Sequence, residues 1–245
     1  MSMLVYKQLI CGYDSALMQQ AFSCSLPSAG LVVLLGRNGC GKTTLLKTTM
    51  GFVAPLSGRV FINDQKLEAL SVKDRAKLMS IVGTKTVLSP YMCVYDLIAL
   101  GRYPYLSFMG RLQDNDRAII EQIVDVLGIQ HLQMKRLSNC SDGEIQLVQL
   151  ARALAQDTPV ILLDEATAHL DFVNKVKIFE CLQNLARQQN KLILMSTHDL
   201  QIAMHYADWV LLFEKGKILY DNAANMLDSG VLSRVFEAEN LNFRL

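Results

Sequence analysis

The sequence predicts an α/β fold, in which a parallel sheet carries helices and a helical lobe is inserted in the middle of the chain. Short apolar runs at 31–35, 160–163 and 192–196 alternate with helical segments, and such alternation favours a parallel sheet. The chain has 245 residues and 51% hydrophobic side chains. This is enough for one large domain with a substantial core.

The first elements along the chain are strands that surround a glycine-rich loop. Residues 4–10 and 58–62 have a strand pattern and predict an antiparallel, β-rich amino-terminal subdomain. The run 31–35 is a buried strand that leads directly into the loop. A helix is expected over 43–50, where Gly51 and then Pro55 end it.

The middle of the chain differs because its pattern is helical. Between about residues 90 and 156, Asp114 is the expected N-cap of a helix over 116–127, and Gly128 is its stop. A second helix is expected over 144–156. This stretch therefore predicts a helical subdomain inserted into the sheet.

The last third returns to alternating elements. We expect two helices and then a hairpin that turns at Lys215 and Gly216: the helices cover 175–189 and 199–207, and the hairpin covers 209–220. The predicted organisation is a single domain over 1–245. Its core and β subdomain are residues 1–83 and 157–245, and its helical subdomain is 84–156.

Charge and hydropathy narrow the classes of function. The formal net charge is +1, so we expect no nucleic-acid partner. No apolar run approaches the ~18–20 residues that span a bilayer, and the start MSMLVYKQLI lacks the features of a signal peptide. The six cysteines show neither a C-x-x-C pair nor zinc spacing, so we expect them reduced. These features predict a cytoplasmic chain that would need a separate membrane component.

The segment 36–43, GRNGCGKT, matches the phosphate-loop pattern G-x-x-x-x-G-K-[ST] between an expected strand and an expected helix. Its glycines let backbone N–H groups approach phosphates, and the helix N-terminus adds partial positive charge. Lys42 is expected on the β and γ phosphates, and the Thr43 hydroxyl on Mg²⁺. The predicted ATP-binding residues here are Gly36, Arg37, Asn38, Gly39, Cys40, Gly41, Lys42, Thr43 and Thr44.

Residues 160–165, VILLDE, form an apolar run that ends in two carboxylates. Such a strand places Asp164 near the metal, and Glu165 can polarise the attacking water as a general base. Together the two motifs predict a P-loop NTPase (RecA-like) core that binds the phosphates of a nucleotide with Mg²⁺. Kinases, GTPases and motor ATPases share these motifs, but the guanine-recognition motif N-K-x-D is absent.

Residues 140–154, CSDGEIQLVQLARAL, resemble the signature segment of ATP-binding-cassette (ABC) proteins, usually L-S-G-G-x-x-Q followed by A-R-A-L. Ser141, Gly143 and Gln146 match that pattern. Ser141 and Glu144 also form an S-x-x-E capping box, whose exposed N–H groups suit an anion. The resemblance implies a dimer with two ATP molecules between its protomers, each contacted by the opposite protomer's signature residues: Ser141, Asp142, Gly143 and Glu144.

Three family positions carry unusual residues. Asp142 replaces the first signature glycine, which brings a carboxylate near the γ-phosphate of the partner's ATP. Because like charges repel, Asp142 must point away or meet a cation. Thr84 aligns with the family's Q-loop glutamine, which contacts Mg²⁺ and the attacking water. A threonine has shorter reach, so its contact with the metal would run through a water. Cys140 replaces the usual leucine.

The other family positions follow in order along the chain. Tyr13 matches the aromatic residue that stacks on adenine. His169 and Asp171 belong to a segment that resembles the D-loop, although Ala166 stands where proline is usual. His198, in STHD, matches the switch histidine at the γ-phosphate. The resemblance thus implies a catalytic set of Glu165, His198 and Lys42.

Residues 94–105, VYDLIALGRYPY, closely resemble the importer ATPases for iron–siderophore complexes, haem and cobalamin. In that branch this part of the helical lobe meets the membrane permease. The resemblance implies ATP-driven import with separate transmembrane permease subunits and, indirectly, a substrate-binding protein. It also implies a peripheral position on the cytoplasmic face of the membrane.

Three alternatives stay open. The chain could be a soluble cassette for iron–sulfur assembly or nucleic-acid maintenance, although the GRYPY string and the single cassette argue against this. It could be an export ATPase, whose cassette is more often fused to its membrane domain. It could also be a regulatory cassette that binds ATP and hydrolyses it poorly, which Asp142 and Thr84 would favour. A Glu165→Gln variant distinguishes the regulatory cassette from an active ATPase, because the substitution can lower ATP hydrolysis only if the wild type hydrolyses ATP.

Overall fold

The structure is a computed structural model that describes residues 2–13, 15–83, 89–106 and 110–236. Its strands are β1 (Ser2–Ile10), β2 (Phe22–Pro27), β3 (Gly30–Leu35), β4 (Ser57–Ile62), β5 (Gln65–Lys66), β6 (Met79–Val82), β7 (Val160–Asp164), β8 (Leu192–Ser196), β9 (Trp209–Glu214) and β10 (Lys217–Asn222). Its α-helices are α1 (Lys42–Met50), α2 (Val72–Leu78), α3 (Val94–Ala99), α4 (Asp114–Leu127), α5 (Asp142–Ala155), α6 (Phe172–Gln188), α7 (Leu200–Tyr206), α8 (Ala223–Asp228) and α9 (Val231–Phe236). Short 3-10 helices are η1 (Leu67–Ala69), η2 (Leu100–Tyr105), η3 (Gln130–Leu132) and η4 (Leu137–Asn139).

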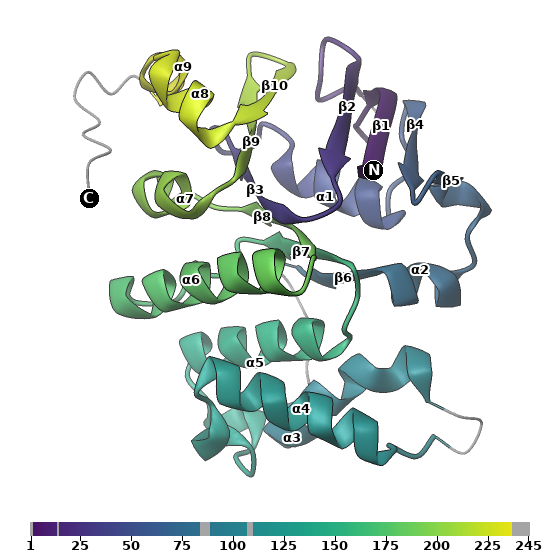
Figure 1. Cartoon of the computed structure of the whole chain (residues 1–245), viewed down its shortest axis with the longest axis vertical. Helices are drawn as coiled ribbons and strands as arrows, with labels where there is room; N and C mark the ends of the chain where they lie inside the picture. The colour runs from purple at the N-terminus through teal and green to yellow at the C-terminus, as the bar shows by residue number, and fades with distance from the viewer. Residues whose placement is uncertain (1, 14, 84–88, 107–109, 237–245) are drawn as a thin grey trace.

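Two sheets organise the described residues (Figure 1). The larger sheet has the order β10-β9-β3-β8-β7-β6, and all its neighbours are parallel except the hairpin of β9 and β10. The smaller sheet is antiparallel, with the order β2-β1-β4-β5. The fold is therefore α/β with an antiparallel amino-terminal sheet, as predicted.

The central strands are buried on both faces, because α-helices cover one side of the large sheet and α1 with the small sheet covers the other. In β3, Leu31, Val33 and Leu35 join the core with the helices, whereas Val32 and Leu34 join the core with the small sheet. This alternation is what the two-residue period of a strand requires. It explains why the central strands are continuous apolar runs in the sequence.

The helices α3, α4 and α5, with η2, η3 and η4, form a helical lobe below the large sheet in Figure 1. Helix α4 begins at Asp114, two residues earlier than predicted, and its N-cap is Gln113 and not Asp114. The amide of Gln113 donates to the Asp116 carboxylate at 2.9 Å, and the Gln113 side chain accepts from the Asp116 amide. This reciprocal capping box fixes the start, and Gly128 ends the helix as predicted.

Several elements have no clear pattern in the sequence. Strand β6 is only four residues long, and helix α2 has no buried residue, so neither gives a periodic signal. The sequence also does not predict the short carboxyl-terminal helices α8 and α9. Strand β6 and helices α8 and α9 bury residues in the core and depend on tertiary contacts more than on local pattern, whereas α2 is capped locally by the Ser71 side chain.

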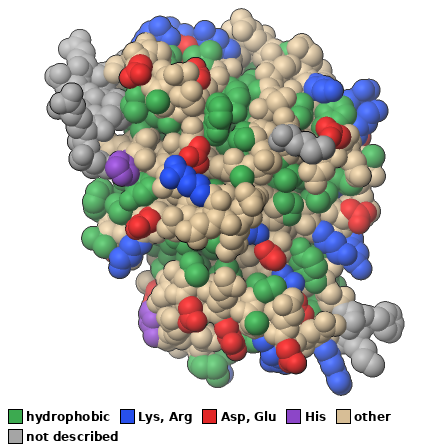
Figure 2. Space-filling model, viewed as in Figure 1, with side chains coloured by type: hydrophobic (Ala, Val, Ile, Leu, Met, Phe, Trp, Pro, Cys, Tyr) green, Lys and Arg blue, Asp and Glu red, His purple; other side chains and the backbone are tan. Residues whose placement is uncertain are grey.

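The surface in Figure 2 shows lysine and arginine side chains interspersed with aspartate and glutamate, without one dominant charge on that face. All six cysteines are free thiols, as expected from their spacing. Within the described residues, no helix is long and apolar enough to cross a membrane.

Candidate nucleotide site

The predicted site residues follow or end three neighbouring strands, at the carboxyl-terminal edge of the large sheet. The glycine-rich loop follows β3, Asp164 ends β7, and His198 comes shortly after β8. Because β3, β8 and β7 are adjacent and parallel, their carboxyl ends lie together. This edge is where α/β sheets bind ligands.

The loop between β3 and α1 has a backbone shape that only glycine adopts readily. Gly36 has φ 152°, and a Cβ there would lie 2.8 Å from Phe213 and from the Cys40 sulfur. Gly41 has φ 109° and is the N-cap of α1, without any side chain that caps the helix. The first N–H groups of α1 thus have no side-chain cap and can bind an anion.

Lys42 is the cation at the centre of this loop. Its side chain is buried, and its Nζ donates to the Gly36 carbonyl at 2.7 Å and to the Arg37 carbonyl at 3.2 Å. These carbonyls hold the ammonium group across the loop. A phosphate entering the loop would offer the same ammonium a stronger, charged acceptor.

Asp164 lies in a small network of oxygens. Its Oδ1 accepts from the Thr43 hydroxyl at 3.1 Å and from the Ser196 hydroxyl at 2.7 Å. The register of β7 and β8 pairs Asp164 with Ser196 directly. A buried carboxylate beside a threonine hydroxyl is a set of hard oxygen donors that fits Mg²⁺. Ser196 is absent from the predicted site, because its role follows from strand pairing.

Glu165 and His198 face each other beside this network. Glu165 has φ 53°, a left-handed conformation that is uncommon for a residue with a side chain. Its amide donates to the Ser196 carbonyl at 3.2 Å and hydroxyl at 3.0 Å. Its Oε1 is 2.7 Å from His198 Nε2. Strained backbone of this kind is concentrated at functional sites.

A cavity of about 620 Å³ unites most of the predicted residues. It is lined by Tyr13, Leu17, the loop residues 38–44, Glu165 and His198. Tyr13 is 56% exposed, so its ring is available to stack on a ligand. Arg37 instead lines a neighbouring cavity of about 330 Å³ with Leu17 and Cys40.

The signature residues do not line this cavity in the same chain. Ser141 is the N-cap of α5, and both hydrogen bonds of the expected capping box are present: the Ser141 amide to Glu144 at 2.7 Å and the Glu144 amide to Ser141 at 3.3 Å. Asp142 is the first residue of the helix and is exposed. The structure thus places Ser141 and Asp142 away from the nucleotide cavity of their own chain.

Glu144 has a further partner that the sequence does not reveal. Lys135 Nζ lies 2.8 Å from its Oε2. The hydrogen bond from Lys135, helped by the Ser141 amide, holds the pKa of Glu144 below its ordinary value. Glu144 is therefore a charged cap already engaged within its own chain.

The predicted D-loop residues have separate roles. Asp171 is the N-cap of α6, where its Oδ1 accepts from the Asn174 amide at 2.8 Å. The His169 amide donates to the side chain of Gln146 in α5 at 2.9 Å. Thr84, the predicted Q-loop position, lies outside the described residues.

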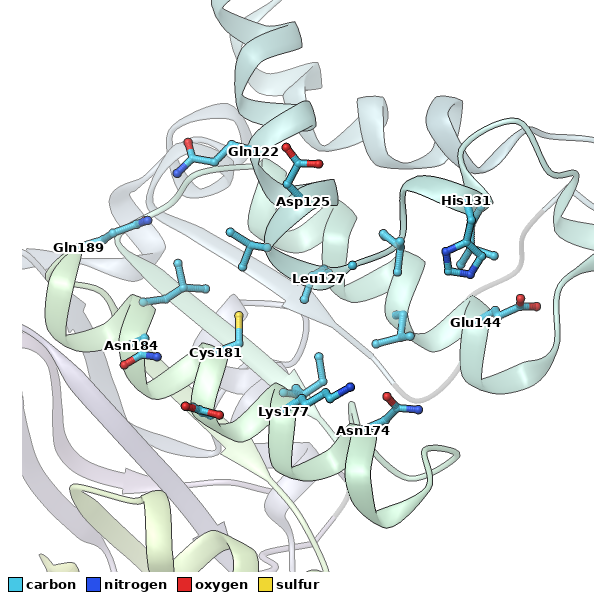
Figure 3. A pocket seen from close by; sticks show the side chains of 18 of the residues that line it. Gln122, Asp125, Leu127, His131, Glu144, Asn174, Lys177, Cys181, Asn184 and Gln189 are labelled. Atoms are coloured by element: carbon cyan, nitrogen blue, oxygen red, sulfur yellow. The ribbon is translucent and has the colours of Figure 1, made fainter.

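A separate cleft lies between α6 and the helical lobe. This cleft of about 810 Å³ has Asp125 and His131 on the lobe side and Asn174 and Lys177 on α6 (Figure 3). Glu144 of α5 also reaches its rim. None of the residues that line the nucleotide cavity lines this cleft.

The comparison with protein families matches residues 20–168 to the family described as ABC transporter. The match covers the phosphate loop, the signature segment and the strand that ends in Asp164. The chain belongs to the ABC transporter family.

Among curated ABC relatives, the chain is 32% identical to an iron(3+)-hydroxamate import ATP-binding protein of Bacillus subtilis, over 98% of this chain and 89% of that protein. It is 33% identical to an achromobactin transport ATP-binding protein of Dickeya dadantii, over 100% of this chain and 90% of that protein. A solved ABC transporter described as metal-chelate type, in an inward-facing conformation, superposes with a TM-score of 0.83 at 26% identity, over 97% of this chain and 90% of that chain.

This membership confirms the fold and the class predicted from the motifs. The chain is an ABC cassette of the importer branch, and its reaction is ATP hydrolysis. The cavity beside Lys42 is lined by the phosphate loop of this cassette together with Glu165 and His198.

Proposed function

We propose that this ABC ATPase powers the uptake of a metal chelate of the iron–siderophore, haem or cobalamin type, through separate permease subunits. The relatives named for iron(3+)-hydroxamate import and achromobactin transport carry the transport part of the proposal. The pair Glu165 and His198, which are 2.7 Å apart and line the same cavity as the phosphate loop, supports the hydrolysis that would drive it. This arrangement provides a base and an orienting group beside the place where phosphates bind.

The binding step uses groups that already converge. The N–H groups of the loop and the Lys42 ammonium would hold the phosphates, and the exposed Tyr13 ring would stack on the adenine. Thr43 and Asp164 would hold Mg²⁺. That ion supplies Lewis-acid stabilisation of the negative charge on the phosphate oxygens.

Hydrolysis then follows from the position of Glu165. Its carboxylate accepts a proton from a water as the water oxygen bonds to the γ-phosphorus, and the bond from that phosphorus to the bridging oxygen breaks. His198 would orient the Glu165 carboxylate through their short contact and, from the wall of the same cavity, would face the γ-phosphate. Lys42 stabilises the charge that develops during transfer.

A second copy of the chain completes the site in this proposal. Ser141 and the exposed start of α5 do not line the cavity of their own protomer. They are free to approach the ATP of a partner protomer, where the helix N-terminus suits an anion. ATP would then close the dimer, and hydrolysis would reopen it.

The permease would dock on the helical lobe. Tyr91 and Tyr103 are 77% and 73% exposed there, and Leu100 is 48% exposed. Exposed aromatic side chains of this kind are enriched at protein interfaces. We propose that residues 84–156 turn as a unit against the core and so transmit closure to the permease.

The test is to purify the chain from detergent-solubilised native membranes and identify what accompanies it. We expect a polytopic permease in stoichiometric amount, with a substrate-binding protein encoded or recovered alongside it. Recovery only from the soluble fraction, with iron–sulfur assembly or nucleic-acid proteins attached, would overturn the transport role and leave the ATPase role intact.

A further inference from the structure

Gln146, in the second turn of α5, forms a two-point hydrogen-bonded link to the backbone after β7. Its Nε2 donates to the Glu165 carbonyl at 2.8 Å, and its Oε1 accepts from the His169 amide at 2.9 Å. The carbonyl can only accept and the amide N–H can only donate, so the orientation of the Gln146 amide is chemically determined.

The same face of α5 packs closely on this loop one turn earlier. Gly143 lies three residues before Gln146, and a Cβ at Gly143 would be 3.1 Å from the His169 carbonyl and 3.5 Å from Leu170. Residues three apart share a helix face. The first turns of α5 are therefore seated on the loop 165–170, with the Gln146 side chain as the polar connection.

Glu165 is held from two directions by this arrangement. Its amide is bound to Ser196 of β8, and its carbonyl is bound to Gln146 of α5. Between these two anchors it keeps the left-handed φ of 53°. The direction in which the Glu165 carboxylate points consequently depends on the position of α5 as well as on the sheet.

At its other end α5 is tied to a different part of the core. Gln156 Nε2 donates to the carbonyls of Ala76 at 2.6 Å and Met79 at 3.0 Å. Beside the Gln146 end, by contrast, lies the open cleft between the lobe and α6 (Figure 3), which Glu144 and Leu147 of α5 help to line. Arg152 of α5 also donates to the Ile81 carbonyl of β6 at 3.3 Å. The links at the two ends of α5 thus reach different parts of the core, and the Gln146 link is the one that reaches Glu165.

We propose that Gln146 is a positioning residue that transmits the orientation of the helical lobe to Glu165 and His169 within one protomer. The inference rests on the proposed role of Glu165 as the general base. Movement of α5 would pull on the Glu165 carbonyl and the His169 amide together, so a shift of the lobe would align or misalign the base.

The experiment uses the full chain with three substitutions. Gln146→Met keeps the length of the side chain and removes both hydrogen bonds. Gln146→Glu can still accept from His169 but places a carboxylate against the Glu165 carbonyl. Gln156→Met is the matched control, because it removes two hydrogen bonds between the same helix and the core without touching residues 165–169.

We expect Gln146→Met to lower kcat for ATP hydrolysis about tenfold or more while the ATP dissociation constant stays within about twofold. Gln156→Met should lower thermal stability by about as much as Gln146→Met does, because each variant loses two hydrogen bonds, but it should leave kcat within about twofold. Amide exchange at His169 should become faster in Gln146→Met but remain slow in Gln146→Glu.

An unchanged kcat in Gln146→Met, or an equal loss in Gln156→Met, would overturn the proposal. So would His169 exchange that is the same in Gln146→Met and the wild type. A wild-type chain that does not hydrolyse ATP would count against the proposed function instead. In that case His169 exchange in Gln146→Met, which needs no turnover, still decides whether the link positions the loop.

Discussion

The nucleotide core and the helical lobe use their charged residues in opposite ways. In the core, Lys42 and Glu165 line one cavity, and Lys42 and the buried Asp164 are bonded to groups that a ligand could replace. In the lobe, Arg102 and Asp116 are buried against each other, 2.8 Å apart. The core therefore keeps charge available for chemistry, whereas the lobe uses charge to fix its own shape.

The GRYPY string, residues 101–105, contains both buried residues that support the lobe and exposed residues on its surface. A Cβ at Gly101 would lie 2.3 Å from the Arg152 carbonyl, so only glycine allows η2 to approach α5 this closely. Arg102 also donates to the Ala155 carbonyl at 2.9 Å and lies over the Tyr105 ring. Tyr103, by contrast, is exposed. The string that resembles the importer branch is thus partly an internal support and partly a surface.

The largest expected effect is at the core. Glu165→Gln removes the proposed base and should lower the ATP hydrolysis rate about 10²–10⁴-fold. Nucleotide affinity should change little, because the loop and Lys42 are untouched. Hydrolysis is measured by phosphate release and affinity by titration with a fluorescent nucleotide. A variant as active as the wild type would remove Glu165 from the mechanism.

The second prediction concerns the lobe. Asp116→Ala leaves Arg102 buried without its carboxylate and should lower the free energy of unfolding by about 3–5 kcal/mol. Glu68→Ala is the control, since Glu68 and Arg59 are 3.7 Å apart and more than half exposed, and such a pair contributes about 0–1 kcal/mol. Urea unfolding compares the two. Equal losses would mean that the buried pair has no special role in the lobe.

The lobe should also be the acid-sensitive region. Burial opposes the charged form of Asp116, but hydrogen bonds from the Gln113 amide and Arg102 outweigh it and hold the pKa of this carboxyl below its ordinary value. A lowered folded-state pKa contributes stability above the unfolded pKa, about 3.9. That stability is lost as the pH falls through the folded pKa.

We therefore expect the free energy of unfolding, measured by urea titration, to decrease as the pH falls from about 5 to 3 and below, in part because Asp116 becomes protonated. Asp116→Asn cannot titrate and should show a smaller decrease over the same range. If the wild type and Asp116→Asn lose stability in parallel, the acid sensitivity comes from other carboxylates.

The sequence predicted the parts of the site whose residues are neighbours along the chain. A strand, a glycine loop and a helix follow directly in the chain around Lys42, so their arrangement is encoded in the spacing. Ser196, Lys135 and the contacts of Gln146 depend on elements that are far apart in sequence, and no spacing reveals them. The predicted N-cap Asp114 was wrong because Gln113 and Asp116 cap each other across the helix start. The roles given to the individual site residues stay predictions.

The smallest expected effect is at Asp142, where the sequence departs from the signature pattern. In the proposed dimer its exposed carboxylate would lie near the partner's γ-phosphate, and two like charges about 4 Å apart in water repel by about 1 kcal/mol. Asp142→Asn should therefore raise the hydrolysis rate several-fold, about fivefold at low ionic strength, and less in high salt because salt screens the repulsion.

Stability should change in the opposite direction. Asp142 is the first residue of α5, where a negative charge favours the helix by about 0.3–1 kcal/mol. Asp114→Asn is the matched control, because Asp114 is the exposed first residue of α4 and lies outside the signature. Both variants should lose a little stability, but only Asp142→Asn should gain activity. A gain that persists unchanged in high salt, or that Asp114→Asn shares, would show that repulsion at the nucleotide is not what Asp142 contributes.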